Sequence, residues 1–166
     1  MITEPAPSAK KHEDFQVLWV FGAISAPLRQ QIVAFWLREG AIANADEAWR
    51  RCGEVACLLR EAESGRIAGV CTVAIRLDDD GHSYGYVRIF IRPASRLAGL
   101  NVRLMQKMIK GFEDLAREPG APRRLLATIE NRKLERRAIQ KILARLGFVH
   151  AGRTADGELV IHRPLR

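Results

Sequence analysis

The segment from residue 84 to residue 117 joins a strand pattern directly to a long amphipathic helix pattern. Residues 84–91, YGYVRIFI, are rich in aromatic and β-branched side chains, and Pro93 ends the run because proline cannot donate to a sheet ladder. Apolar residues then recur at helical spacing within residues 99–117. A strand that leads into a helix over so short a connection favours an α/β fold.

The other patterns complete one mixed α/β domain. Helix patterns follow Ser25 and Asn44, and a further one spans residues 133–146. Strand patterns are predicted at residues 15–21, 54–61, 67–77, 125–129, 148–153 and 159–163. Because neither a repeat nor a second core is visible, we predict a single domain at residues 15–166 with a partly antiparallel sheet. Residues 1–14 are predicted to be a flexible tail.

Composition excludes several other classes of protein. With 166 residues and 48% hydrophobic side chains, the chain has enough apolar material for a core and is not disordered throughout. The longest apolar run, residues 17–24, is far shorter than a membrane-crossing helix, and residues 1–14 lack the apolar core of a signal peptide. We therefore expect a soluble, cytoplasmic protein without a membrane partner.

Neither cysteines nor histidines are spaced as a metal site. Cys52, Cys57 and Cys71 give no even disulfide framework and no CxxC motif, so we expect reduced and mostly buried thiols. The four histidines are far apart and include no H-x-x-x-H pair. No metal is predicted.

Basic residues are concentrated in the second half of the chain. Residues 1–85 carry 9 basic and 12 acidic side chains, whereas residues 86–166 carry 18 and 7, so the halves are net −3 and +11. A positive field of this kind suggests a phosphate-bearing partner, such as a nucleic acid, an anionic membrane surface or a phosphorylated cofactor. A solvated basic surface explains it equally well.

The connection between the strand and the helix is a natural site for an anion. The first N–H groups of a helix have no partner within it, and the helix dipole adds roughly half a positive charge at that end. Gly99 carries no Cβ that would block a diphosphate. This junction is therefore the candidate phosphate-binding loop.

At this loop the sequence resembles the GNAT superfamily of acyl-CoA-dependent N-acetyltransferases. The family's pyrophosphate motif is Q/R-x-x-G-x-G/A, and residues 96–101, RLAGLN, follow Pro93 at the family's spacing. Residues 144–148, ARLGF, are similar to the end of the family's fourth helix. The resemblance covers residues 15–165 and implies a sheet flanked by about four helices and splayed between its fourth and fifth strands.

The resemblance also implies acetyl-CoA as the acyl donor. Amides at residues 97–101 would bind its pyrophosphate, and Ile89 and Ile91 would offer backbone groups to its pantetheine arm. Arg96 is favoured as a cofactor contact over a solvated charge. The implied cofactor-binding residues are Ile89, Ile91, Arg96, Leu97, Ala98, Gly99, Leu100 and Asn101.

The catalytic pattern departs from that of the family. Leu143 stands where many members carry a tyrosine as general acid. Some relatives carry a carboxylate at the site-facing positions of the fourth strand, but here these positions are Gly85 and Val87. Glu130 and Asn131 remain as candidates, each able to order a water that relays the amine proton. Asn131 fits equally well as a helix cap. Tyr84 and Tyr86 are further candidate acids, although a tyrosine at strand spacing is more often part of a core.

These features lead to one function with two alternatives. The leading hypothesis is an N-acetyltransferase that transfers acetyl from acetyl-CoA to a primary amine of a small molecule or protein, directly in a ternary complex. The alternatives are a CoA-binding module without catalysis and a family enzyme acting on an RNA-linked amine. A nucleic-acid partner is not favoured, and a homodimer is left open. In the family the first two helices shape the acceptor pocket, where Phe35, Trp36 and Trp49 fit either pocket or core.

Overall fold

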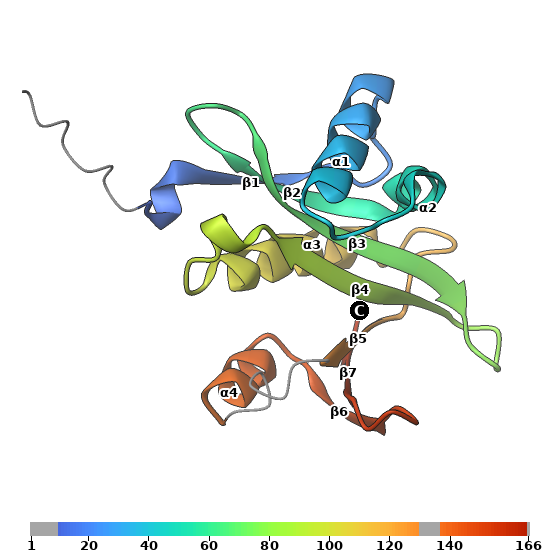
Figure 1. The fold of residues 1–166 in the computed structure, drawn as a ribbon. Coiled ribbons are helices and arrows are strands. Elements are labelled where there is room, and N and C mark those ends of the chain that lie inside the picture. Colours follow the sequence, from blue (N-terminus) through green and yellow to red (C-terminus); the bar gives the residue numbers. More distant parts are fainter. Residues whose placement is uncertain (1–9, 130–136, 166) are drawn as a thin grey trace, which may run out of the picture.

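A seven-stranded sheet organises the computed structural model, which describes residues 10–129 and 137–165 (Figure 1). Its strand order is β1-β2-β3-β4-β5-β7-β6. The strands are β1 (Phe15–Trp19), β2 (Val55–Glu61), β3 (Ile67–Leu77), β4 (Ser83–Ile91), β5 (Arg124–Ile129), β6 (Val149–Arg153) and β7 (Leu159–Pro164). The α-helices of these ranges are α1 (Ala26–Arg38), α2 (Ala45–Arg51), α3 (Leu100–Leu115) and α4 (Arg137–Arg145). None of these helices is long and apolar enough to cross a membrane.

The element order and the mixed sheet confirm the sequence prediction. All neighbouring strands are antiparallel except β4 and β5, which are parallel. Element ends differ by a few residues, as in the first strand, which ends at Trp19 rather than at residue 21. Phe21 lies outside that strand, and its ring packs against Trp19 and Phe112 at 5.7 and 5.0 Å between centroids.

Side-chain caps fix the starts of the first two helices, as the sequence predicts. The Ser25 hydroxyl accepts a hydrogen bond from the Leu28 amide at 3.3 Å, and Asn44 Oδ1 accepts one from the Glu47 amide at 3.1 Å. Each bond satisfies a donor that has no partner inside the helix, which is worth about 1 kcal/mol. These caps hold α1 and α2 in place over the first half of the sheet.

Two apolar layers cover opposite faces of the sheet. On one face α3 buries Leu104, Met108 and Phe112 against the strands. On the other face α1 buries Ile32 and Phe35. Strand β3, third in the strand order, is buried on both faces from residue 67 to residue 74. The sheet is therefore rigid at β3, and β4 is fixed to it along its whole length.

The sheet opens between β4 and β5. The two strands pair only between residues 84–86 and residues 124–126, and beyond these residues they diverge. Gly85 lies in the paired part, where an added Cβ would be 2.6 Å from Val73 Cγ1 and 3.1 Å from Leu125 Cδ2. Glycine therefore permits the close approach that holds the two halves of the sheet together at one end of the opening.

We predict that Gly85→Ala destabilises the protein by about 1–3 kcal/mol, because the new methyl group overpacks the contact with Val73 and Leu125. Urea unfolding of the variant and the parent protein measures this difference. Gly53→Ala is the matched control, since a Cβ there meets nothing within 4 Å and the backbone φ is ordinary. Equal stabilities of the Gly85 variant and the control would contradict the packing argument.

All three cysteine thiols are buried, as the sequence predicts. Burial raises the pKa of Cys57 to about 12, and it raises the pKa values of Cys52 and Cys71 as well. At pH 8 a thiol with a pKa near 12 is thiolate in about one molecule in ten thousand. We predict that Ellman's reagent detects no thiol in the native protein within minutes and three in the denatured chain. Rapid reaction of the native protein would contradict this burial.

Candidate functional site

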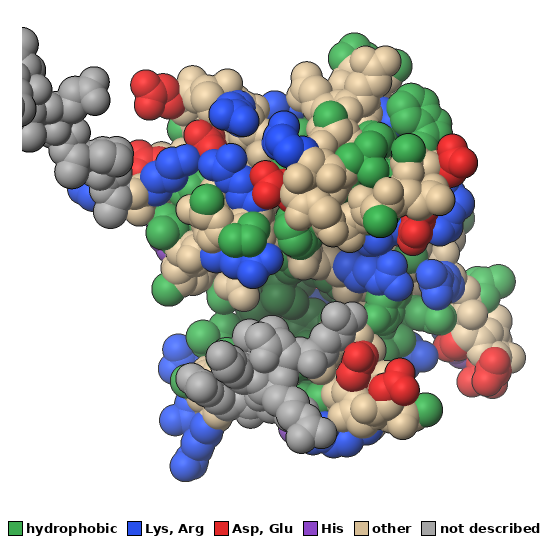
Figure 2. All heavy atoms as spheres, in the orientation of Figure 1, with side chains coloured by type: hydrophobic (Ala, Val, Ile, Leu, Met, Phe, Trp, Pro, Cys, Tyr) green, Lys and Arg blue, Asp and Glu red, His purple; other side chains and the backbone are tan. Residues whose placement is uncertain are grey.

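A cavity of about 880 Å³ opens where β4 and β5 diverge. Residues 86–91 of β4 and 127–129 of β5 form two of its walls, and residues 96–99 lie at one end. Residues of α3 and α4 line it on one face of the sheet, and residues of α1 and α2 line it on the other. Figure 2 shows the hollow with a mainly hydrophobic lining and with Lys and Arg side chains along its upper rim. The cavity therefore meets both faces of the sheet.

The loop between β4 and α3 presents free backbone donors. Residues 93–95 form a short 3₁₀ helix, and Gly99 has a φ of +87°, a left-handed conformation that favours glycine, directly before α3. The amides of Ala98, Gly99 and Asn101 have no hydrogen-bond partner among the described residues. N–H groups at the start of a helix bind phosphate-type anions, so the geometry fits the predicted loop.

The remaining amides of this loop already have partners. The Leu97 amide donates to Ser95 O at 2.9 Å, and the Leu100 amide donates to Leu97 O at 3.2 Å. The Leu100 side chain is fully buried and does not line the cavity. The Val102 amide donates to Asn101 Oδ1 at 2.9 Å, so that side chain caps its own helix. Fewer amides are free for an anion than the motif alone suggests.

Arg96 is held at the end of β4. Its Nε donates to Ile91 O at 2.7 Å, and its guanidinium lies 5.7 Å from the centre of the Phe90 ring. Arg96, Ile89 and Ile91 all line the cavity, together with the free amides of the loop. The structure thus brings the cofactor-binding residues of the sequence prediction to one cavity, with the exception of Leu100.

A residue that the sequence analysis did not single out packs on this loop. His12 Nε2 lies within hydrogen-bond distance of Ala98 O, and Arg103 donates to His12 O at 2.7 Å. A Cβ on Gly99 would lie 3.1 Å from His12 Cε1. The segment before β1 therefore supports the loop from outside the motif, over a separation of 86 residues that no local pattern reveals.

The two predicted catalytic residues cannot be placed. Glu130 and Asn131 lie outside the described residues, so their proposed roles stay predictions. Leu143 does line the cavity, and its side chain has no proton to give. The site therefore needs another group if a side chain is to carry a proton.

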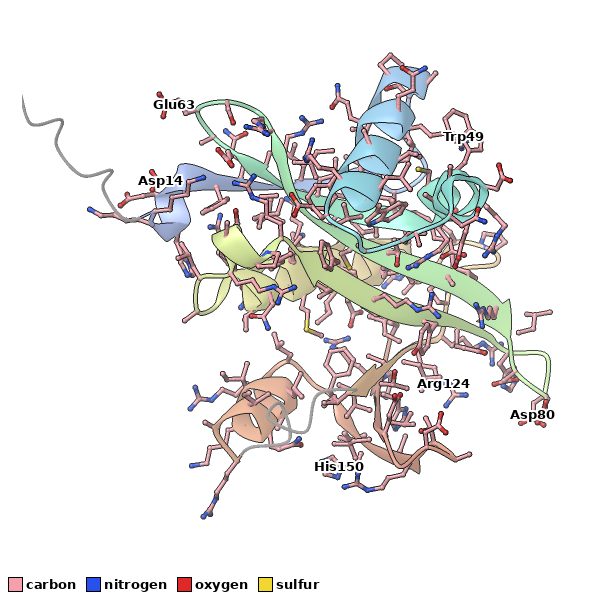
Figure 3. All side chains as sticks on the ribbon, in the orientation of Figure 1. Asp14, Trp49, Glu63, Asp80, Arg124 and His150 are labelled. Atoms are coloured by element: carbon pink, nitrogen blue, oxygen red, sulfur yellow. The ribbon has the colours of Figure 1, made fainter. Side chains whose placement is uncertain are left out.

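Tyr86 and Thr128 join the two walls of the cavity. Tyr86 is the last residue of β4 that pairs with β5, and its hydroxyl lies 2.7 Å from Thr128 Oγ1. Both side chains line the cavity and are half-buried. Tyr84 lies outside the cavity, with the guanidinium of Arg124, labelled in Figure 3, 5.6 Å from its ring centre. Of the two tyrosines considered as acids, only Tyr86 reaches the site.

Two arginines lie on the opposite side of the cavity from the loop helix α3. Arg51, at the end of α2, donates from NH2 to Thr72 Oγ1 at 3.3 Å, and Thr72 is the register partner of Arg88. Burial lowers the pKa of Arg51, and the neighbouring charge of Arg88 lowers it further, while Glu54 raises it. The structure therefore places two like charges at one end of an apolar cavity.

The alternation of side chains along β4 could have predicted part of the cavity wall that faces α1 and α2. Tyr86, Arg88 and Phe90 share one face of β4, and all three line the cavity. The sequence analysis considered Gly85 and Val87, which lie on the other face. Arg51 carried no such signal, because it reaches the cavity from a separate helix.

The three aromatic residues considered for the acceptor pocket occupy different environments. Trp36 lines the cavity, and Phe35 is buried in the core against Phe90. Trp49 is 46% exposed on the outer side of α2, where Figure 3 labels it, and the guanidinium of Arg29 lies over its ring. Only Trp36 therefore belongs to the pocket wall.

Comparison with known proteins agrees with this geometry. The model of the acetyltransferase (GNAT) family matches residues 24–148. A comparison with curated protein sequences gave no significant match.

Several solved structures share the fold. A GNAT-family acetyltransferase from Bordetella pertussis has a TM-score of 0.64 at 22% identity, over 89% of this chain and 99% of that one. The ribosomal-protein-S5-alanine acetyltransferase from Vibrio fischeri has a TM-score of 0.63 at 15% identity, over 95% and 97%. The phosphinothricin acetyltransferase from Sinorhizobium meliloti, solved with AcCoA, has a TM-score of 0.65 at 14% identity, over 92% and 89%.

At such low identities the solved structures establish the fold alone. The family model covers most of the chain and includes the loop with its free amides. The parting of β4 from β5 above that loop is the splay that the sequence resemblance implied. The chain is therefore a member of the GNAT family of acetyltransferases.

Proposed function

We propose that this acetyltransferase moves an acetyl group from acetyl-CoA to a primary amine within one ternary complex. One observation carries the proposal. Residues 87–91 of β4 are unpaired on the edge that faces β5, and the cavity joins this edge to the free amides of Ala98, Gly99 and Asn101. An extended chain can add to an unpaired strand, and a diphosphate at its end can bind those amides. The groove therefore suits the pantetheine arm and the pyrophosphate of one molecule.

Acetyl-CoA supplies a thioester whose acyl carbon a neutral amine can attack. The first contribution of the protein to the rate is to hold the thioester and the amine in the right orientation, since effective molarities of well-placed reactants reach about 10⁵ M or more. Val87 and Ile129 are buried and give the cavity an apolar wall. With donor and acceptor entering from opposite faces of the sheet, they would meet where β4 and β5 part.

Tyr86 is the group that we assign to proton transfer. Its hydroxyl carries a proton at the parting of the strands, and Thr128 Oγ1 at 2.7 Å can hold its orientation or exchange a proton with it. A phenol in this place can protonate a leaving thiolate, which is the role that Leu143 cannot fill. Glu130 and Asn131 remain candidates for relaying the amine proton.

A CoA-binding module without catalysis is the second candidate. The presence of Leu143 in the cavity wall favours it, because the position offers no acid. The two functions differ in one measurement, since a module binds CoA and releases no thiol with any amine.

We predict that Gly99→Glu weakens acetyl-CoA binding by about 100-fold or more, as measured by isothermal titration calorimetry. A carboxylate there repels the pyrophosphate, and the loss of two charge-assisted hydrogen bonds of about 1.5–3 kcal/mol each is enough for that factor. The new Cβ also meets His12 at a φ that side chains rarely adopt.

Gly65→Glu is the matched control for this variant. Gly65 has a φ of +71° in the turn between β2 and β3, and a Cβ there meets nothing within 4 Å. The control carries the same charge and a similar backbone strain far from the loop, so it should bind acetyl-CoA normally. Unchanged binding by a folded Gly99 variant would overturn the proposed donor site.

We predict that Tyr86→Phe lowers kcat by about 10²-fold or more, the range typical of a lost general acid. Acetyl-CoA affinity should stay within a factor of about three, because the variant removes one oxygen outside the loop. Release of CoA thiol measures the rate, and the buried cysteines of the protein do not interfere. Tyr84→Phe, outside the cavity, is the control and should keep the parental rate. A Tyr86 variant with parental kcat would contradict the assignment.

A further inference from the structure

We infer that the acceptor is a small amine that also carries an anionic group, and that Arg51 and Arg88 bind this group. The inference rests on the proposed function, since it concerns the acceptor end of the same cavity. Carboxylate and phosphate share the chemistry that a guanidinium recognises, so both are included.

Arg51 and Arg88 are both neighbours of one residue of the sheet, Thr72. Thr72 of β3 lies directly opposite Arg88 of β4, which puts both side chains on the face covered by α1 and α2. The Thr72 hydroxyl also accepts the hydrogen bond from Arg51 at 3.3 Å. All three residues line the cavity. The two guanidinium groups therefore belong to one wall, although they come from different elements.

Among the described residues, Arg51 keeps one buried donor, its Nε, without a hydrogen-bond partner. Its side chain is only 13% exposed. Glu54 forms a long ion pair with Arg51, with 3.9 Å between Oε2 and that Nε, which is too far for a hydrogen bond. The guanidinium lies 5.6 Å from the centre of the Trp36 ring, which also lines the cavity. A buried donor in this state favours an incoming acceptor of hydrogen bonds.

Arg88 adds a second positive charge to this wall of the cavity. No ion pair joins it to a carboxylate of the described residues, and its guanidinium lies 5.0 Å from the centre of the Tyr86 ring. Burial is the main cause of the lowered pKa of Arg51, and the like charge of Arg88 lowers it further. Holding two like charges together costs stability unless an anion lies between them. A carboxylate or phosphate would relieve this repulsion.

The place of these arginines limits the size of the acceptor. Arg88 is two residues from Tyr86 along β4, and its guanidinium lies over the Tyr86 ring. The anionic group would therefore bind close to the proposed site of proton transfer. An amine and an anionic group separated by a few bonds fit this spacing, as in an amino acid or an aminoalkylphosphonate.

A panel of matched amines tests the inference with the full-length protein and acetyl-CoA. The panel contains amino acids, the carboxamide of each, aminoalkylphosphonates, and the diamines putrescine and cadaverine. We expect kcat/KM for at least one anionic amine to exceed that of its neutral counterpart by about tenfold or more. The amino acid and phosphonate arms separate the two kinds of anion.

Arg88→Gln and Arg51→Gln are expected to raise KM for the anionic amine by 10- to 100-fold and to bring the ratio of acid to carboxamide close to one. KM for acetyl-CoA should not change. Arg76→Gln is the matched control, because Arg76 is exposed on β3 opposite Tyr84 and lies outside the cavity. Since Arg88 is exposed, its variant should fold even where the Arg51 variant does not.

Three results would overturn the inference. If carboxamides or diamines are acetylated as well as the acids, or if Arg88→Gln keeps the parental preference, the acceptor is not bound through an anion and the acetyltransferase proposal stands. If no amine in the panel releases CoA although acetyl-CoA binds, both the inference and the proposed amine transfer fail.

Discussion

The parting of β4 from β5 is the constraint on which the site depends. The two strands pair at residues 84–86 and 124–126 and then diverge, while β4 stays paired with β3 to its end. Unpaired strand backbone is costly to leave without a partner, so the opening favours a ligand that completes the sheet. The loop with its free amides continues from the same strand, so both halves of the proposed donor site follow from one feature.

The opening also separates two chemical environments. Toward α3 and α4 the cavity wall is apolar, with Ile89 and Leu143 among its residues. Toward α1 and α2 it carries Arg51 and Arg88 beside the rings of Trp36 and Tyr86. Because β4 alternates its side chains between these faces, one strand contributes to both. The proposed donor and acceptor sites therefore share a wall only one strand thick.

The sequence predicted well where the chemistry is local. The run from Pro93 to Gly99 encodes a strand end, a turn at positive φ and a helix start within a few residues, so the loop could be identified without coordinates. The caps at Ser25 and Asn44 were predictable for the same reason. His12 and Arg51 were not, because each reaches the site from a distant part of the chain. The charge of each half of the chain gave no guide either, since Arg51 lies in the half that is net −3.

The amino-acid sequence alone predicted the element order and the helix start after Gly99, because these depend on periodicity and on contiguous residues, and its resemblance to a known family indicated the acetyltransferase class. Only the tertiary structure showed which loop amides have no partner among the described residues, which tyrosine reaches the cavity and that Arg51 and Arg88 line it. Tyr84 and Tyr86 are both tyrosines on the same face of β4. Only Tyr86 lines the cavity, because β5 diverges from β4 directly after it. The point of divergence is set by packing between distant segments, which no local pattern records.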